Sequence, residues 1–257
     1  MLTAALDGVR QAGAAIDIDG CDLTDRRMYV RIVAPQIKAL APTLLANYRS
    51  PFRDGNVRRA GGWDMGAGLA AADREGQGYG GEEPVVFGGF VLSNSETGGG
   101  AFTITPRLVI QVCKNGLCIT QDVLRSVHLG SKMDEGVVRW SDDTNQKNIA
   151  LVTAKTRDAV ATFLDTAYME RVISRIEEQA GVEVAKPQEI VQQVGKRLTF
   201  DEATIDGVLE HFMRGGDMTA GGVMNAVTSF AQTVDDADKA HEIEQQGLRA
   251  LDMVAAL

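Results

Sequence analysis

The hydrophobic pattern of this chain changes its period once, and that change constrains the fold more than any other feature. Between residues 85 and 120, short runs of β-branched, aliphatic and aromatic residues are separated by breaks that contain glycine or asparagine, as in antiparallel strands. After about residue 145, apolar residues recur at every third or fourth position, as on the buried face of a helix. We therefore predict an α+β fold, with an antiparallel β-sheet or meander in residues 1–144 and a helical region in residues 145–257 packed on it.

An Asn115-Gly116 pair near the end of the strand-rich segment predicts a tight hairpin. Both residues tolerate the positive φ angles of a two-residue type I′ turn. Such a turn would place Cys113 directly opposite Cys118, with both sulfur atoms on one face of the sheet. Further strands are expected at residues 27–33, 85–92 and 102–112, with a bulge at the Gly88-Gly89 pair and a kink or sheet edge at Pro106.

Capping and stop signals divide the rest of the chain. The opening residues predict a short amphipathic helix that stops at Gly13, followed by a polar turn at residues 17–22. An apolar stripe that passes through Val160 predicts a helix ending at Gly181. Later helices are expected to begin at Pro187, at a Thr199–Glu202 capping box, at Thr219 and at Asp235-Asp236. The helix that begins at the capping box is expected to end at Gly215-Gly216.

The composition favours a folded, cytoplasmic protein. Hydrophobic residues make up 44% of the 257 positions, enough for a buried core. Apolar runs stay well short of the roughly 18–20 residues that span a bilayer, so no membrane association is expected. The first residues lack the basic segment and apolar core of a secretory signal. Three cysteines do not make a disulfide framework in a chain of this length.

Charge is distributed unevenly along the chain. Residues 1–59 carry a net charge of +3 and residues 158–257 a net charge of −10, within a total of −9. Phosphate backbones are bound by lysine and arginine, which displace the counterions of the nucleic acid. Any contact with nucleic acid is therefore expected in the N-terminal half, and the acidic helical half would repel it.

The cysteine pair admits three interpretations. Cys113 and Cys118 are small hydrophobic residues of the core, or a reversible cross-strand disulfide, which a reducing cytoplasm disfavours. As a third alternative they are weak metal candidates together with His128, the nearest histidine. That metal site would lack a fourth ligand, and we expect no bound cofactor.

Motifs of several enzyme classes are missing from the sequence. None of the three histidines stands in an H-E-x-x-H motif, and there is no G-x-S-x-G nucleophile elbow. The glycine clusters do not form a phosphate-binding G-x-x-x-x-G-K-[ST] loop. These absences make a non-enzymatic protein the stronger expectation.

A basic segment with interleaved aromatic residues gives the most specific functional hint. Arginine planes and aromatic rings stack on the bases of single-stranded nucleic acid, and the positive charge follows its backbone. A solvated basic loop is the alternative interpretation. A glycine-rich insertion at residues 61–84 adjoins the segment and is expected to be a long loop. The candidate nucleic-acid-binding residues are Tyr48, Arg49, Phe52, Arg53, Arg58 and Arg59.

Six separated runs of the chain carry a family resemblance. The runs are Ser93–Gly98, Pro106–Leu108, Val112–Gly116, Arg125–His128, Gly216–Thr219 and Asn225–Thr228. Together they resemble the phage/plasmid-like protein family, domain of unknown function 932. This resemblance implies a mobile-element or phage origin and a role inside the host cell, but it brings no reaction and no catalytic residues. Accessory proteins of mobile elements often handle DNA, which favours nucleic acid by association only.

Three functional hypotheses follow from the sequence. The first is a non-enzymatic accessory protein of DNA metabolism, a homo-oligomer that binds single-stranded DNA. The second is an enzyme or metal protein centred on Cys113, Cys118 and His128. The third is a factor whose acidic helical half binds a host or phage protein.

Overall fold

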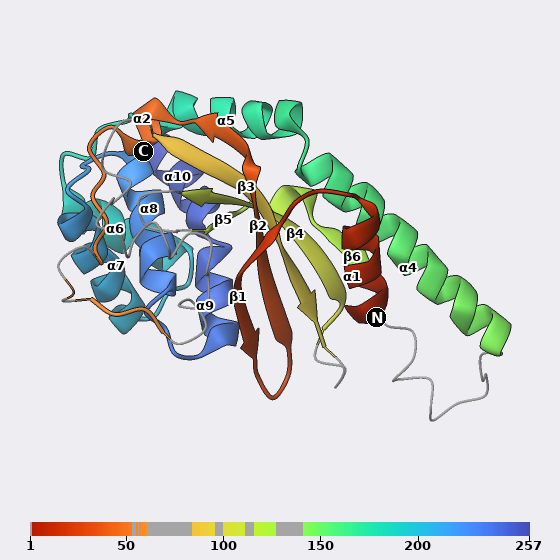
Figure 1. Cartoon of the computed structure of the whole chain (residues 1–257). Helices are drawn as coiled ribbons and strands as arrows, with labels where there is room; N and C mark the ends of the chain where they lie inside the picture. Colours follow the sequence, from red (N-terminus) through yellow and green to blue (C-terminus); the bar gives the residue numbers. More distant parts are fainter. Residues whose placement is uncertain are drawn as a thin grey trace.

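The computed structural model describes residues 2–52, 55, 57–60, 84–95, 100–110, 116–126 and 141–257. Within these residues the chain combines an antiparallel sheet with a mainly helical C-terminal half (Figure 1), which confirms the predicted α+β class. The predicted glycine-rich insertion at 61–84 lies outside the described residues, apart from Pro84. The strands are β1 (Asp17–Leu23), β2 (Met28–Leu40), β3 (Val85–Asn94), β4 (Phe102–Ile110), β5 (Gly116–Cys118) and β6 (Leu124–Ser126), with a short 3₁₀ helix η2 (Thr120–Asp122) between the last two.

The strands follow one another in the order β1-β2-β3-β4-β5, and every described pairing is antiparallel. Strand β6 pairs with the first part of β4 and β5 with its last part. Pro106 lies between these two pairings, where the outer side of β4 carries no continuous ladder. The sheet therefore accommodates a residue that has no backbone N–H to donate.

The predicted polar turn at residues 17–22 is wrong, because these residues form strand β1 along the edge of the sheet. Its register against β2 shifts between Ile18 and Gly20, so that Asp19 has no residue directly opposite. This is a β-bulge, which bends a strand and redirects a side chain. Asp and Gly favour turns in isolation, but here pairing with the buried strand β2 decides the conformation.

The predicted type I′ turn at Asn115-Gly116 is also wrong. Gly116 pairs with Val109 inside strand β5, and it is not among the glycines with positive φ. Cys118 consequently lies opposite Arg107, not opposite Cys113. Residues 111–115, including Cys113, lie outside the described residues. The predicted bulge at Gly88-Gly89 falls instead on the neighbouring strand, where the register of β2 shifts between Ala34 and Lys38.

One face of the sheet is apolar and is covered by one helix that precedes the sheet in sequence and by helices that follow it. Side chains at alternate positions of β2, β3 and β4, such as Ile32, Phe90 and Ile104, form one core cluster with residues of α1 (Leu2–Gln11) and α4 (Asp142–Phe163). Helix α5 (Thr166–Ala180) then crosses the end of β2 (Figure 1). The predicted stripe through Val160 thus belongs to two helices, because Asp165 caps the second one.

The remaining helices pack around α8 (Ala220–Ala231), which is buried on nearly all sides. The predicted starts at Pro187 and Thr219 are confirmed, and so is the glycine stop after the intervening helix, where Gly216 has a φ of 71°. The N-cap of that intervening helix is Asp201 rather than Thr199. The helices are α2 (Pro42–Leu45), α6 (Pro187–Arg197), α7 (Glu202–Gly215), α8 (Ala220–Ala231), α9 (Ala237–Glu244) and α10 (Gly247–Ala255).

Membrane-spanning helices are absent from the described part of the chain, since no helix there is both long and apolar enough.

Candidate functional site

The second face of the sheet carries two arginines in its interior. Arg31 on β2 and Arg107 on β4 are 0% and 1% exposed, respectively. Each interrupts an otherwise apolar run of its strand, and burying a charge is costly unless it is paired and hydrogen-bonded. Their partners therefore define the most unusual chemistry in the described structure.

Three carboxylates from two distant parts of the chain pair with these arginines. Arg107 donates from Nε to Oε1 of Glu244 at 2.9 Å and from a terminal nitrogen to Asp19 at 2.7 Å. Arg31 donates to Asp22, and its Nε lies 4.0 Å from Oε2 of Glu244. Glu244 thus links the two guanidinium groups, which makes helix α9 an integral part of this face of the sheet.

Two local features of the backbone make this network fit. The bulge in β1 directs the side chain of Asp19 into the interior, where it is only 5% exposed. On the opposite side, a Cβ atom at Gly116 would overlap Nε of Arg107 and Oε1 of Glu244. Only glycine at this position allows the arginine and the glutamate to meet beside β5.

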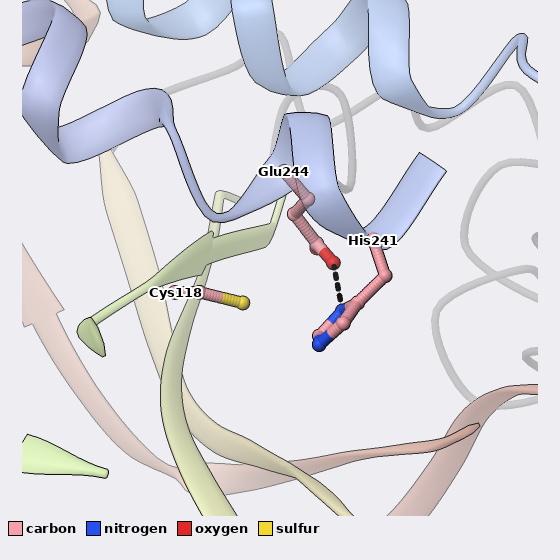
Figure 2. A group of neighbouring side chains, drawn as sticks. All are labelled: Cys118, His241 and Glu244. Carbon is pink, nitrogen blue, oxygen red and sulfur yellow. Dashed lines mark ion pairs between the residues drawn. The ribbon is translucent and has the colours of Figure 1, made fainter. Parts of the chain in front are cut away.

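Cys118 and His241 complete the cluster (Figure 2). The ligand atoms of Cys118, His241 and Glu244 lie within 4.8 Å of one another, and all three residues are buried. Nδ1 of His241 is 3.7 Å from Oε2 of Glu244, one turn further along α9. Nε2 of the same ring lies 2.8 Å from the side-chain amide of Gln245.

The cluster fixes the protonation of two of its members. Burial alone would raise the pKa of Glu244, but the positive charge of Arg107, followed by His241 and Arg31, lowers it to about 2. Burial, reinforced by the negative charge of Glu244, raises the pKa of the Cys118 thiol well above its usual range. Glu244 is therefore an anion at neutral pH, and Cys118 is a neutral thiol unless a cation displaces its proton.

A polar pocket of about 270 Å³ lies on the same face, next to the cluster. The register places Ser93, Thr103 and Arg125 side by side across β3, β4 and β6. Arg27 contributes a second guanidinium at the start of β2, packed against Gly100. His241 belongs both to this pocket and to the buried cluster. The other lining residues include Thr105, Thr120 and Gln245.

Helix α9 is also attached to the β1–β2 turn. Tyr29 donates its hydroxyl hydrogen to Asp238 at 2.6 Å, and Thr24 donates to the same carboxylate at 3.2 Å. The ring of Tyr29 lies against His241, with their centroids 4.6 Å apart. These contacts hold the histidine between the pocket and the arginines.

A larger hollow of about 540 Å³ lies between α5 and η2. Its walls are mostly apolar, and two of its polar side chains are already engaged: the Tyr168 hydroxyl donates to Asp122, and Arg175 donates to Gln121. It therefore offers fewer converging polar groups to a ligand than the pocket beside His241.

The predicted nucleic-acid-binding segment is only partly exposed. Arg49 and Arg58 are exposed, whereas Tyr48 is 7% exposed and packs against Gly215. The Arg59 guanidinium lies 4.1 Å from the centre of the Phe52 ring and also donates to Gln232. Arg53 lies outside the described residues. The arginines, more than the Tyr48 ring, are thus available to a nucleic acid, and the hypothesis stays a prediction.

The predicted metal candidates are not brought together within the described residues. Cys113 and His128 lie outside them, and Cys118 instead adjoins His241 and Glu244. Sequence reasoning missed Arg31, Arg107 and Asp19 as well as both residues of α9. A signal was present for the arginines, because each is the one charged residue within an apolar run of its strand, at residues 28–35 and 106–110.

His211 is a second buried histidine, with a structural role. Its Nδ1 shares a hydrogen bond of 2.9 Å with Ser229, and its ring meets Phe52 and Phe230 edge-on. Burial lowers its pKa from 6.5 to about 4. The folded protein therefore holds this ring neutral at pH values where the unfolded chain already protonates it.

This shift predicts a loss of stability on mild acidification. The unfolded chain binds the extra proton below about pH 6.5, so the contribution of His211 is complete above that pH and declines as the pH falls toward 4. The decline amounts to about 3 kcal/mol. Urea unfolding of the wild type and of His211→Gln between pH 7 and 4 tests this. Equal slopes of stability against pH in the two proteins would contradict it.

Searches against models of protein families, curated proteins and solved structures find no match to this chain.

Proposed function

We propose that this protein binds a small phosphate monoester in the pocket between Arg27 and Arg125. The observation that carries the proposal is the convergence of two guanidinium groups and several hydroxyl side chains on one cavity of about 270 Å³. That volume is just below the range of about 300–1,000 Å³ of typical ligand pockets. The ligand should therefore be little larger than a mononucleotide.

The chemistry of the walls supports an anionic oxygen-rich ligand. Arginine binds phosphate through paired N–H donors, which are stronger than neutral hydrogen bonds. Ser93 and Thr105 line the same pocket and are 6% and 1% exposed, so their hydroxyl groups are already held in place. A rigid pocket wall reduces the entropy that is lost when a ligand binds. The arginine–carboxylate network next to His241 supplies that rigidity.

We expect isothermal titration calorimetry to detect adenosine 5′-monophosphate binding to the wild type, and inorganic phosphate binding more weakly. Arg125→Gln should reduce the affinity by about 10- to 100-fold, the effect of one lost hydrogen bond between charged groups. Arg10→Gln is the matched control, because Arg10 is an exposed arginine on α1, on the apolar side of the sheet. Equal affinities of the wild type and Arg125→Gln would refute the proposal.

Single-stranded DNA remains our second proposed ligand, within a phage- or plasmid-derived protein of the host cytoplasm. The exposure of Arg49 and Arg58 in a segment with net positive charge supports it. The same titration with a short oligonucleotide separates the two candidates. Loss of oligonucleotide binding in an Arg49→Gln/Arg58→Gln variant that still binds the nucleotide would assign the DNA to this segment.

A further inference from the structure

Within the group of Cys118, His241 and Glu244, two nitrogen or oxygen atoms have no hydrogen-bond partner among the described residues. They are Nδ1 of His241 and Oε2 of Glu244. The side chains of both residues are at least nine-tenths buried, at 5% and 0% exposure. Buried polar atoms without partners are rare, and a bound ion is one of their recognised explanations. Both atoms are directed toward the same small region, which the sulfur of Cys118 also borders (Figure 2).

The charges of the network leave room for one additional cation. Arg31 and Arg107 contribute two positive charges, and their three carboxylate partners contribute three negative charges. The arginines and carboxylates of the network therefore carry one negative charge between them. A divalent cation that displaces the Cys118 thiol proton makes the network neutral.

We propose that Cys118, His241 and Glu244 form a zinc site, with Sγ, Nδ1 and Oε2 as the ligand atoms. Thiolate, imidazole and carboxylate together are a ligand set that zinc accepts, and three protein ligands with a further open position are typical of exchangeable zinc sites. Binding transfers the Cys118 proton to solvent, so that one Zn²⁺ enters and one H⁺ leaves.

The geometry is close to that of a loaded site. Ligand atoms around tetrahedral zinc are roughly 3.3–3.6 Å apart, given bond lengths of about 2.0–2.3 Å. The His241 and Glu244 atoms are already 3.7 Å apart, whereas the full set spans up to 4.8 Å. A shift of about 1 Å by the Cys118 or His241 side chain would close the site. Gln245 can hold Nε2 of His241, as outer-shell groups do for ligating histidines.

The experiment uses chelator-treated full-length protein without any phosphate ligand, so its outcome is independent of the nucleotide pocket. Titration with Zn²⁺ should show one equivalent bound and about one proton released per chain. Titration with Co²⁺ should produce an ultraviolet thiolate-to-metal absorption band. Cys118→Ser should abolish this band and weaken Zn²⁺ binding by more than about 100-fold, beyond the effect of outer-shell substitutions.

Cys21→Ser is the matched control, because Cys21 is an exposed cysteine on β1, and it should leave the band and the affinity unchanged. If circular dichroism shows that Cys118→Ser does not fold, His241→Gln replaces it with the same expected loss of affinity. Absence of Zn²⁺ binding at micromolar concentration would overturn the site. Wild-type affinity in a folded Cys118→Ser or His241→Gln protein would overturn it as well.

Discussion

Replacing Glu244 by alanine should lower the free energy of unfolding by about 3–5 kcal/mol, the usual effect of removing one partner from a buried ion pair. The substitution leaves Nε of Arg107 without its carboxylate and removes the anion that links Arg107 to Arg31. A typical domain is stable by only about 5–15 kcal/mol, so a large part of the stability would be lost. Urea unfolding followed by circular dichroism measures the change.

Glu242→Ala provides the matched control, since Glu242 lies on the same helix but is exposed. It should change the stability by no more than about 0.5 kcal/mol. Glu244→Gln keeps an acceptor for Arg107 while removing the charge, and its effect should fall between the two. A loss below about 1 kcal/mol for Glu244→Ala would show that the network contributes little to stability.

Gly116→Ala should destabilise the fold by about 2–3 kcal/mol, toward the upper end of the usual cost of overpacking. The added methyl group would occupy the space of Arg107 Nε and Glu244 Oε1, which lie only 2.9 Å apart in their hydrogen bond, so this buried pair would have to separate. The change is read from the midpoint and slope of urea unfolding.

Gly181→Ala is the comparison for this second substitution. A Cβ atom at Gly181 would meet only the Thr43 methyl group, at 3.1 Å, and the residue lies at the exposed end of α5. Its effect should be small. Gly116→Ala and Glu244→Ala should also be less than additive in one chain, because both disrupt the same pair. If the two losses of stability add fully, the methyl group at position 116 does not act through the Arg107–Glu244 pair.

Periodicity was sufficient to predict the fold class and most helix boundaries. The strand and helix patterns, the glycine stop at Gly216 and the cap at Thr219 are local signals, and the structure confirms them. The turn at Asn115-Gly116 failed for a physical reason. The dipeptide permits a type I′ turn but does not require one. Gly116 instead lies in strand β5, where its lack of a side chain leaves space for Arg107 and Glu244.

The candidate site was less predictable, because its members are far apart in sequence. Asp19 and Glu244 pair with Arg107 across 88 and 137 residues, and no local pattern encodes such a separation. Glu242 and Glu244 look alike in the sequence, and only the buried Ala240, four residues earlier on α9, marks the second as inward-facing. For His241 the sequence shows only that it is not part of an H-E-x-x-H motif.

The bridge from Arg107 to Glu244 has a consequence for synthesis of the protein. Strands β1 to β4 leave the ribosome long before α9. Arg31 and Arg107 therefore lack their shared partner Glu244 until that residue has emerged. Contacts of this sequence separation are formed late and slowly. During translation the two arginines on this face of the nascent sheet are therefore incompletely neutralised. Their charges are balanced and covered only when helix α9 packs on the sheet.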